Sequence, residues 1–229
     1  MKKLYLILAM FFTTYSIHAQ SNKFEMGIEG GPGIGGNSKT SVDLGNGNYI
    51  FSLYAEVSYS YGITGLYKLS DHISIKTGLQ YRQNAFDEKV TDYENGKPNT
   101  SDFGQISVDY LALPVMIRYS FGNKINCFIN GGPYLDYFLK EAIRGYIATA
   151  NHQTVIYASN PNSPFDLGAT LGIGAGINIL PRLRIELEAG GDYMLFNFKP
   201  AQTNTPDATN TRFFGKLLLG IRYRLGKGE

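Results

Sequence analysis

Charged side chains recur at every second position in several segments, and this spacing is the one most able to support chemistry. Glu186 and Glu188 illustrate it, because residues two apart in a β-strand point to the same side and two such carboxylates could share a proton. Arg184 lies two positions before them, and other segments carry Lys or Arg in comparable places. We therefore favour a structural network of ion pairs over catalysis.

The acidic and basic residues of this pattern are nearly equal in number. Glu25 and Glu29, in an earlier segment, add to the acidic set. If these side chains face the inside of a narrow barrel, they can pair with one another and fill it. The charged residues that we expect in this network are Glu56, Lys76, Arg82, Arg118, Asp136, Arg184, Glu186, Glu188, Asp192, Lys216 and Arg222.

Another set of residues has the composition of a hydrolase triad. His152 is followed by Ser159, Ser163 and Asp166, but these residues are close only along the sequence, and a triad is defined by its geometry. The acidic residues between positions 87 and 102 are too irregularly spaced for a calcium loop. We expect no catalytic residue, no metal and no cofactor, and an enzyme with a site in the loop around His152 stays an alternative.

Seven segments place uncharged, mostly apolar residues at odd positions and their charges at even positions. Because side chains alternate between the two sides of a strand, each segment predicts a strand with one uncharged face. Residues 24–34 predict an additional first strand, with the opposite parity. The seven segments span residues 57–69, 73–83, 111–121, 125–139, 167–179, 183–195 and 213–225.

The connections between these segments alternate between short and long. Short turns are expected at residues 70–72, 122–124 and 180–182. Long loops rich in Asn, Asp, Thr, Pro and Gly are expected at residues 37–50, 84–105, 140–165 and 196–211. The sequence therefore predicts an all-β fold, an eight-stranded antiparallel up-and-down transmembrane β-barrel with short periplasmic turns and long extracellular loops.

Aromatic residues indicate that the uncharged face contacts lipid. Tyr59 and Tyr61 lie toward the long-loop end, Tyr119 and Phe121 lie toward the short-turn end, and aliphatic residues lie between them. Two aromatic girdles around an apolar band are typical of outer-membrane barrels. A soluble barrel with its apolar face around a ligand is the alternative, but it has no need for this banding.

The N-terminus and the composition agree with export to the outer membrane. Lys2 and Lys3 precede an apolar run that ends near Ala19, which predicts a cleaved signal peptide over residues 1–19 and a barrel domain over residues 20–229. The chain has 21 basic and 19 acidic residues, and removing both signal-peptide lysines makes it neutral, so we expect no nucleic-acid partner. Cys127 is the single cysteine, so no intrachain disulfide can form.

Two prolines fall inside predicted strands, in segments that resemble a known family. Pro114 and Pro133 each remove a ladder hydrogen bond, and we expect a bulge or a bend at each. Three segments resemble the PorT-like outer-membrane β-barrel family, whose members are small OmpA/OmpX-type barrels. They are Tyr110-Leu111-Ala112-Leu113-Pro114, the following Gly131-Gly132-Pro133-Tyr134-Leu135, and residues 168–177, in which glycine alternates with other residues. The resemblance implies a barrel with prolines at these places, and the best-known members assist a secretion system.

These observations favour a non-enzymatic outer-membrane barrel that acts through its loops, in binding, envelope structure or assistance to a secretion system. Within residues 140–165, four apolar residues are candidates for contact with an envelope or secretion-system protein, although they could equally extend a strand above the membrane. These residues are Tyr146, Ile147, Ile156 and Tyr157. A small-solute porin-like channel is the alternative, and it is disfavoured because eight strands enclose little space.

Overall fold

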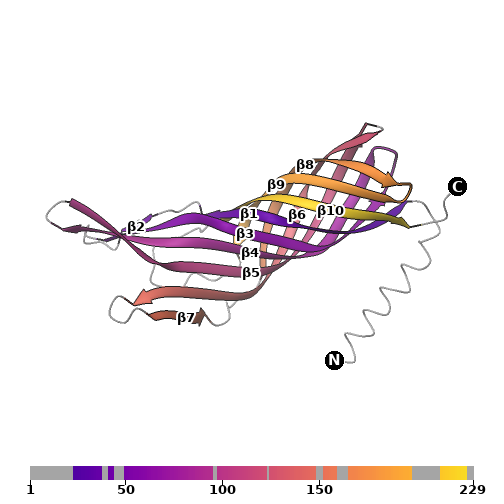
Figure 1. The fold of residues 1–229 in the computed structure, drawn as a ribbon. Coiled ribbons are helices and arrows are strands. Elements are labelled where there is room, and N and C mark those ends of the chain that lie inside the picture. Colours follow the sequence, from indigo (N-terminus) through magenta and orange to yellow (C-terminus); the bar gives the residue numbers. More distant parts are fainter. Residues whose placement is uncertain are drawn as a thin grey trace, which may run out of the picture.

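The computed structural model describes residues 23–37, 41–43, 49–94, 97–122, 124–147, 152–158, 165–197 and 212–225. The expected signal peptide, residues 1–19, lies outside these residues. All the regular elements of the described part are β-strands, and Figure 1 shows them as one long sheet that curls into a barrel. Within the described residues, no helix has the length and apolarity needed to cross a membrane.

Eight strands form a closed antiparallel barrel, as predicted. Each strand pairs with its neighbour along the chain, and β1 closes the ring by pairing with both β3 and β10. The barrel strands are β1 (Phe24–Asn37), β3 (Tyr49–Lys68), β4 (Ile73–Glu94), β5 (Lys97–Phe121), β6 (Ile125–Ile147), β8 (Phe165–Leu180), β9 (Leu183–Asn197) and β10 (Arg212–Leu225).

Two short strands lie outside the ring. β2 (Ser41–Asp43) pairs with β3, and β7 (His152–Ala158) pairs with β6. The pairing of Phe24 with Leu225 places the start of the first barrel strand beside the end of the last one. Both ends of the barrel sequence therefore lie at the end where the short turns are, which we call the short-turn end.

The two faces of the barrel wall divide as the period-two pattern predicts. Outward residues such as Val115, Ile117 and Leu171 are exposed apolar side chains, and inward residues such as Lys76 and Arg118 are buried. The outward aromatic residues gather in two levels. Tyr59, Tyr61 and Tyr81 stack on one another at one level, and Tyr119 and Phe121 lie near the short-turn end.

The opposite parity of the first strand is also confirmed. Met26, Ile28 and Ile34 point outward and are exposed, whereas Glu25 and Glu29 are buried inside. In strand β1 the even positions therefore face outward, whereas in the other barrel strands the odd positions do. A slip of one residue would place two carboxylates in lipid, so the charges themselves specify this register.

The expected long loops at residues 84–105 and 140–165 are wrong for most of their length. Strand β4 continues to Glu94 and pairs there with Lys97 at the start of β5, while β6 continues to Ile147 and pairs with β7. A strand outside the membrane does not contact lipid, so neither of its faces has to be apolar. Its sequence therefore has polar residues on both faces and resembles that of a loop. Figure 1 shows these extensions projecting far beyond the closed part of the barrel.

Neither proline forms a bulge, which was one of the two expected outcomes. Pairing between β5 and β6 is interrupted after Pro114, opposite Pro133, and resumes at Ile117 without a change of register. Thr77 of β4 donates a hydrogen bond from Oγ1 to the Pro114 carbonyl oxygen at 2.9 Å. The bulge in this strand pair lies instead at Asp109 and Tyr110.

A charge introduced on the outward face should cost stability according to its depth. Val115 lies on the outward face near the middle of residues 111–121, the segment of β5 with the apolar outward face, and Phe121 lies at its short-turn end. We expect Val115→Arg to lower the free energy of unfolding by about 2–4 kcal/mol and Phe121→Arg by about 0–1 kcal/mol. Urea unfolding in phospholipid vesicles measures both values, and equal costs for the two variants would contradict the assignment of the lipid face.

Candidate functional site

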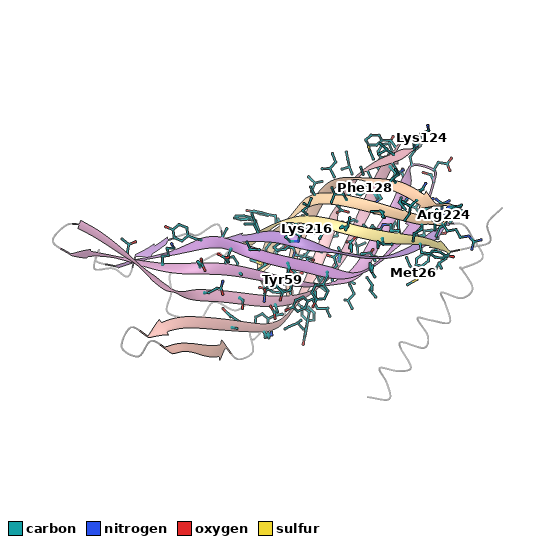
Figure 2. All side chains as sticks on the ribbon, viewed as in Figure 1. Met26, Tyr59, Lys124, Phe128, Lys216 and Arg224 are labelled. Atoms are coloured by element: carbon teal, nitrogen blue, oxygen red, sulfur yellow. The ribbon has the colours of Figure 1, made fainter. Side chains whose placement is uncertain are left out.

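The interior of the barrel is the most unusual chemical feature of the molecule, because it is filled with ionised side chains. Alternate residues of the strands point inward, and Figure 2 shows Lys216 and Phe128 among the side chains that come from different strands toward this space. Eight strands enclose a space that side chains alone can fill. We describe its contents from the short-turn end toward the opposite end.

Three carboxylates and three cations alternate around the middle of the barrel in a closed circuit, the six-residue ion-pair ring. Its members are Glu29 of β1, Lys76 of β4, Arg118 of β5, Glu186 and Glu188 of β9, and Arg222 of β10. Glu186 contacts Arg118 at 2.8 Å and Arg222 at 2.6 Å. Lys76 contacts Glu188 at 2.8 Å and Glu29 at 2.9 Å. The circuit closes through Arg222 to Glu29 at 3.2 Å and Arg118 to Glu188 at 3.5 Å.

The ring blocks the lumen at this level. The exposed fraction is 0% for Lys76 and Asn130 and 1% for Arg118, so no water-filled passage runs past them. Arg118 also donates from Nε to the Asn130 side-chain oxygen at 2.8 Å and lies 3.7 Å from the centre of the Phe128 ring. Because each ring member meets two opposite charges, the cost of removing these ions from water is offset as far as geometry allows.

A second ionic group, the four-residue ion-pair chain, lies beyond the ring. Arg82 of β4 joins Asp136 of β6 to Asp192 of β9, and Lys216 of β10 contacts Asp192 at 2.7 Å. The guanidinium carbon of Arg82 lies 4.8 Å from the centre of the Tyr134 ring. The chain is neutral by itself, with two acids and two bases.

The third group lies at the short-turn end. Glu25 of β1 contacts Lys68 at 3.2 Å, Arg224 at 3.5 Å and also Arg184. Arg184 in turn reaches Glu186 at 2.8 Å and so connects this group to the six-residue ring. The single carboxylate of Glu25 therefore contacts three cations, and this group has an excess of positive charge.

Glycines of β8 make room for the ionic interior. A Cβ atom on Gly174 would lie 2.4 Å from the Phe128 ring, and one on Gly172 would lie 2.8 Å from the Glu188 carboxylate. These approaches are closer than van der Waals contact permits. The alternating glycines of this strand are therefore explained by the bulk of the side chains that cross the lumen toward it.

An apolar layer covers the ionic groups at the end away from the short turns. Phe86, Val108, Tyr110 and Phe138 form a buried cluster, and Ile106 packs against it. Next to this cluster, a small hollow is lined by side chains that include Arg82, Asn84, Asp136, Asp166 and Asp192. It has no room for a drug-sized ligand.

All of the predicted network residues except Glu56 form ion pairs in the lumen, but they divide between the ring with Arg184 and the separate four-residue chain. Glu56 is only partly buried, near the bulge between Ala55 and Tyr59, and no ion pair of its carboxylate is found among the described residues. Glu56 has the same parity as the buried Ser58, but it lies four residues beyond Ser60, which pairs with Arg82, and so it is farther from the short turns than the ion pairs of Arg82. The network also includes Glu29 and Asn130; the first was visible from the parity of β1, whereas the second is uncharged and gave no signal.

The residues of the hydrolase-like set are not assembled into a triad. Asp166 pairs with Asp136 across β8 and β6, and His152 pairs with Ile147 near the far end of β6. Eleven residues of extended strand separate Asp136 from Ile147, about 36 Å along β6. Ser159 and Ser163 lie outside the described residues, and within the described part no group of His, Cys, Asp and Glu is arranged to hold a metal.

Comparison with protein families identifies the class of this chain. Residues 18–199 match the model of the outer membrane protein beta-barrel domain. Because the match spans more than half of the chain, the chain belongs to this family. It is an outer-membrane β-barrel, and the uncharged outward face is the face that contacts lipid.

Several solved outer-membrane proteins are similar in structure. Neisserial surface protein A (NspA) has a TM-score of 0.48 and 13% identity over 89% of this chain and 97% of that one. OprG from Pseudomonas aeruginosa has a TM-score of 0.45 and 9% identity over 91% and 99%. Ail, the attachment invasion locus protein of Yersinia pestis, has a TM-score of 0.41 and 10% identity over 88% and 98%. No curated protein sequence matches the chain.

Removing one charged side chain from the ring should lower the free energy of unfolding more than removing two side chains of opposite charge. We expect Lys76→Met to lower the free energy of unfolding by about 3–5 kcal/mol, because Glu29 and Glu188 each lose a cation in a dry interior. Lys76→Met combined with Glu188→Met should recover most of this loss. The remaining ions then form the chain Glu29, Arg222, Glu186, Arg118, in which each carboxylate keeps a cation.

Urea unfolding in phospholipid vesicles measures the single and double variants against wild type. If the double variant is as unstable as the single variant, the charges are not coupled through the ring.

Proposed function

We propose that this protein is a non-enzymatic, non-conducting outer-membrane barrel that binds another protein through the part of its sheet beyond the membrane. The observation that supports the proposal is the contrast between a filled interior and an extended sheet. Strand β6 continues for eleven residues past Asp136, its member of the four-residue ion-pair chain, and pairs there with β7. A protein whose only task was to span the membrane would not need these extensions.

The filled interior argues against a channel. Lys76, Arg118 and Asn130 are buried in the middle of the lumen, and the apolar cluster around Phe86 and Phe138 lies above them. Solutes could pass only if several buried ion pairs separated together. A porin-like channel is therefore the weaker candidate.

The sheet beyond the closed barrel is suited to binding another chain. Its strand order is β2, β3, β4, β5, β6 and β7, and among the described strands β2 and β7 each pair with one neighbour only. The free edge of such a strand presents unpaired backbone N–H and C=O groups, onto which a partner can add a strand. Edges of this kind are the most direct route to a protein contact on this molecule.

The proposed partner is an envelope protein or a component of a secretion system. The resemblance to PorT-like barrels supports this choice, and we propose that the short turns face the periplasm and the extended sheet faces outward, as in other outer-membrane barrels. Tyr146 and Ile147 end β6, and Ile156 and Tyr157 lie in β7, so the candidate contact residues belong to one hairpin. An enzyme is not supported, because His152 and Asp166 are far apart along β6.

Truncation of the β6–β7 hairpin tests the proposed contact. Ala142 pairs directly with Tyr157, so replacing residues 143–156 by Asn-Gly should give a tight turn and leave the barrel intact. We expect this variant to assemble normally, as judged by its heat-modifiable mobility in SDS gels. It should lose a protein that co-purifies with wild type after cross-linking in intact cells and mild detergent extraction.

The matched control shortens the neighbouring hairpin. Lys89 pairs with Asp102, so residues 90–101 can be replaced by Asn-Gly in the same way. The control should retain the partner. Identical co-purifying proteins from wild type and the β6–β7 truncation would rule out this hairpin as the contact.

A further inference from the structure

The short-turn end of the lumen contains a small pocket with an unusual concentration of arginine. The pocket is a small hollow, open to the outside, with no room for a drug-sized ligand. Its lining residues are Glu25, Asn178, Pro181, Arg182, Arg184, Arg222 and Arg224. Four guanidinium groups thus surround a space that holds one carboxylate.

The positions of these arginines are set by backbone pairing. Arg184 and Arg222 are directly opposite each other on β9 and β10, which places two like charges side by side. The Arg224 backbone N–H donates to the carbonyl oxygen of Arg182, in the turn before β9, at 2.8 Å, so this second pair is also fixed. Three of the four arginines therefore lie on two adjacent strands, and the fourth lies in the turn before one of them.

The carboxylates nearby do not use all of the donors. Glu25 is shared among Lys68, Arg184 and Arg224, and Glu186 is shared among Arg118, Arg184 and Arg222. Arg222 is 2% exposed, yet its Nη1 group has no hydrogen-bond partner. A buried guanidinium N–H without an acceptor is unfavourable, and an anion in the adjoining pocket would supply one.

We propose that this pocket binds a phosphate group, with Arg182 and Arg224 at its entrance and Arg184 and Arg222 at its inner wall. Phosphate fits because its several acceptor oxygens can meet more than one guanidinium fork at once. The phosphate can belong to a phospholipid headgroup of the leaflet at this end or to a free phosphate ion. Both sources share the same chemistry, and they differ in how they reach the pocket.

The test uses inorganic phosphate and the purified full barrel in dodecyl maltoside, a neutral detergent without phosphate. Isothermal titration calorimetry should show saturable phosphate binding that sodium chloride of equal ionic strength does not displace. Arg182→Gln should weaken this binding about tenfold, because it removes one charge-assisted contact. Lys124→Gln is the matched control, an exposed cation at the same end but outside the pocket (Figure 2), and it should bind as wild type does.

A second arm identifies a lipid source. Wild type and both variants are reconstituted with phosphatidylglycerol, extracted again, and weighed by native mass spectrometry. A phospholipid retained by wild type and by Lys124→Gln, but not by Arg182→Gln, supports a headgroup in the pocket. Arg224→Gln provides a second variant, and heat-modifiable mobility in SDS gels verifies that each protein is folded.

The proposal is overturned if neither phosphate nor phospholipid binds to wild type. It is also overturned if Arg182→Gln and Lys124→Gln weaken binding equally, because the effect is then one of general charge. Binding of free phosphate without lipid retention supports the free ion, and lipid retention without free-phosphate binding supports the headgroup.

Discussion

The structure depends on one constraint, which is that a closed barrel of eight strands has no room inside for bulk water. Any charged side chain that faces the lumen must therefore be neutralised by another side chain from across the barrel. The six-residue ring satisfies this condition with equal numbers of acids and bases, drawn from β1, β4, β5, β9 and β10. Because the partners come from distant parts of the sequence, the ion pairs tie the barrel together across its interior as well as around its wall.

The same constraint explains features that look unrelated in the sequence. The glycines of β8 provide the space that Phe128, Glu186 and Glu188 occupy, and the reversed parity of β1 brings Glu29 to the ring. The outward face of the barrel carries uncharged residues because it contacts lipid. Acids and bases are equal in number within the ring and within the chain, whereas at the short-turn end Glu25 alone contacts three cations.

Much of this fold could be predicted because a membrane imposes a strict period of two on the chain. The strand count, the lipid face and most inward charges follow from that period, including the reversed first strand. Beyond the membrane no face of a strand has to be apolar, so strands with two polar faces have the composition of loops. One signal for the longer hairpin is present in the sequence: the dipeptide Asn95-Gly96, which favours a tight hairpin turn, lies between β4 and β5. The partners within the ring could not be predicted, because strand stagger decides which charges lie at the same height. Glu56 is outside the network for a similar reason, because it lies four residues beyond Ser60, the residue that pairs with Arg82.

The central claim is that side chains close the lumen, and electrical recording tests it most directly. Purified protein is inserted into a planar lipid bilayer, with a general porin in separate bilayers as a positive control. A lumen closed by the ion-pair ring gives no steady, reproducible conductance steps, although insertion is verified afterwards by recovering folded protein from the bilayer lipid. Uniform conductance steps that scale with the amount of inserted protein would show an open, water-filled passage and would contradict the account.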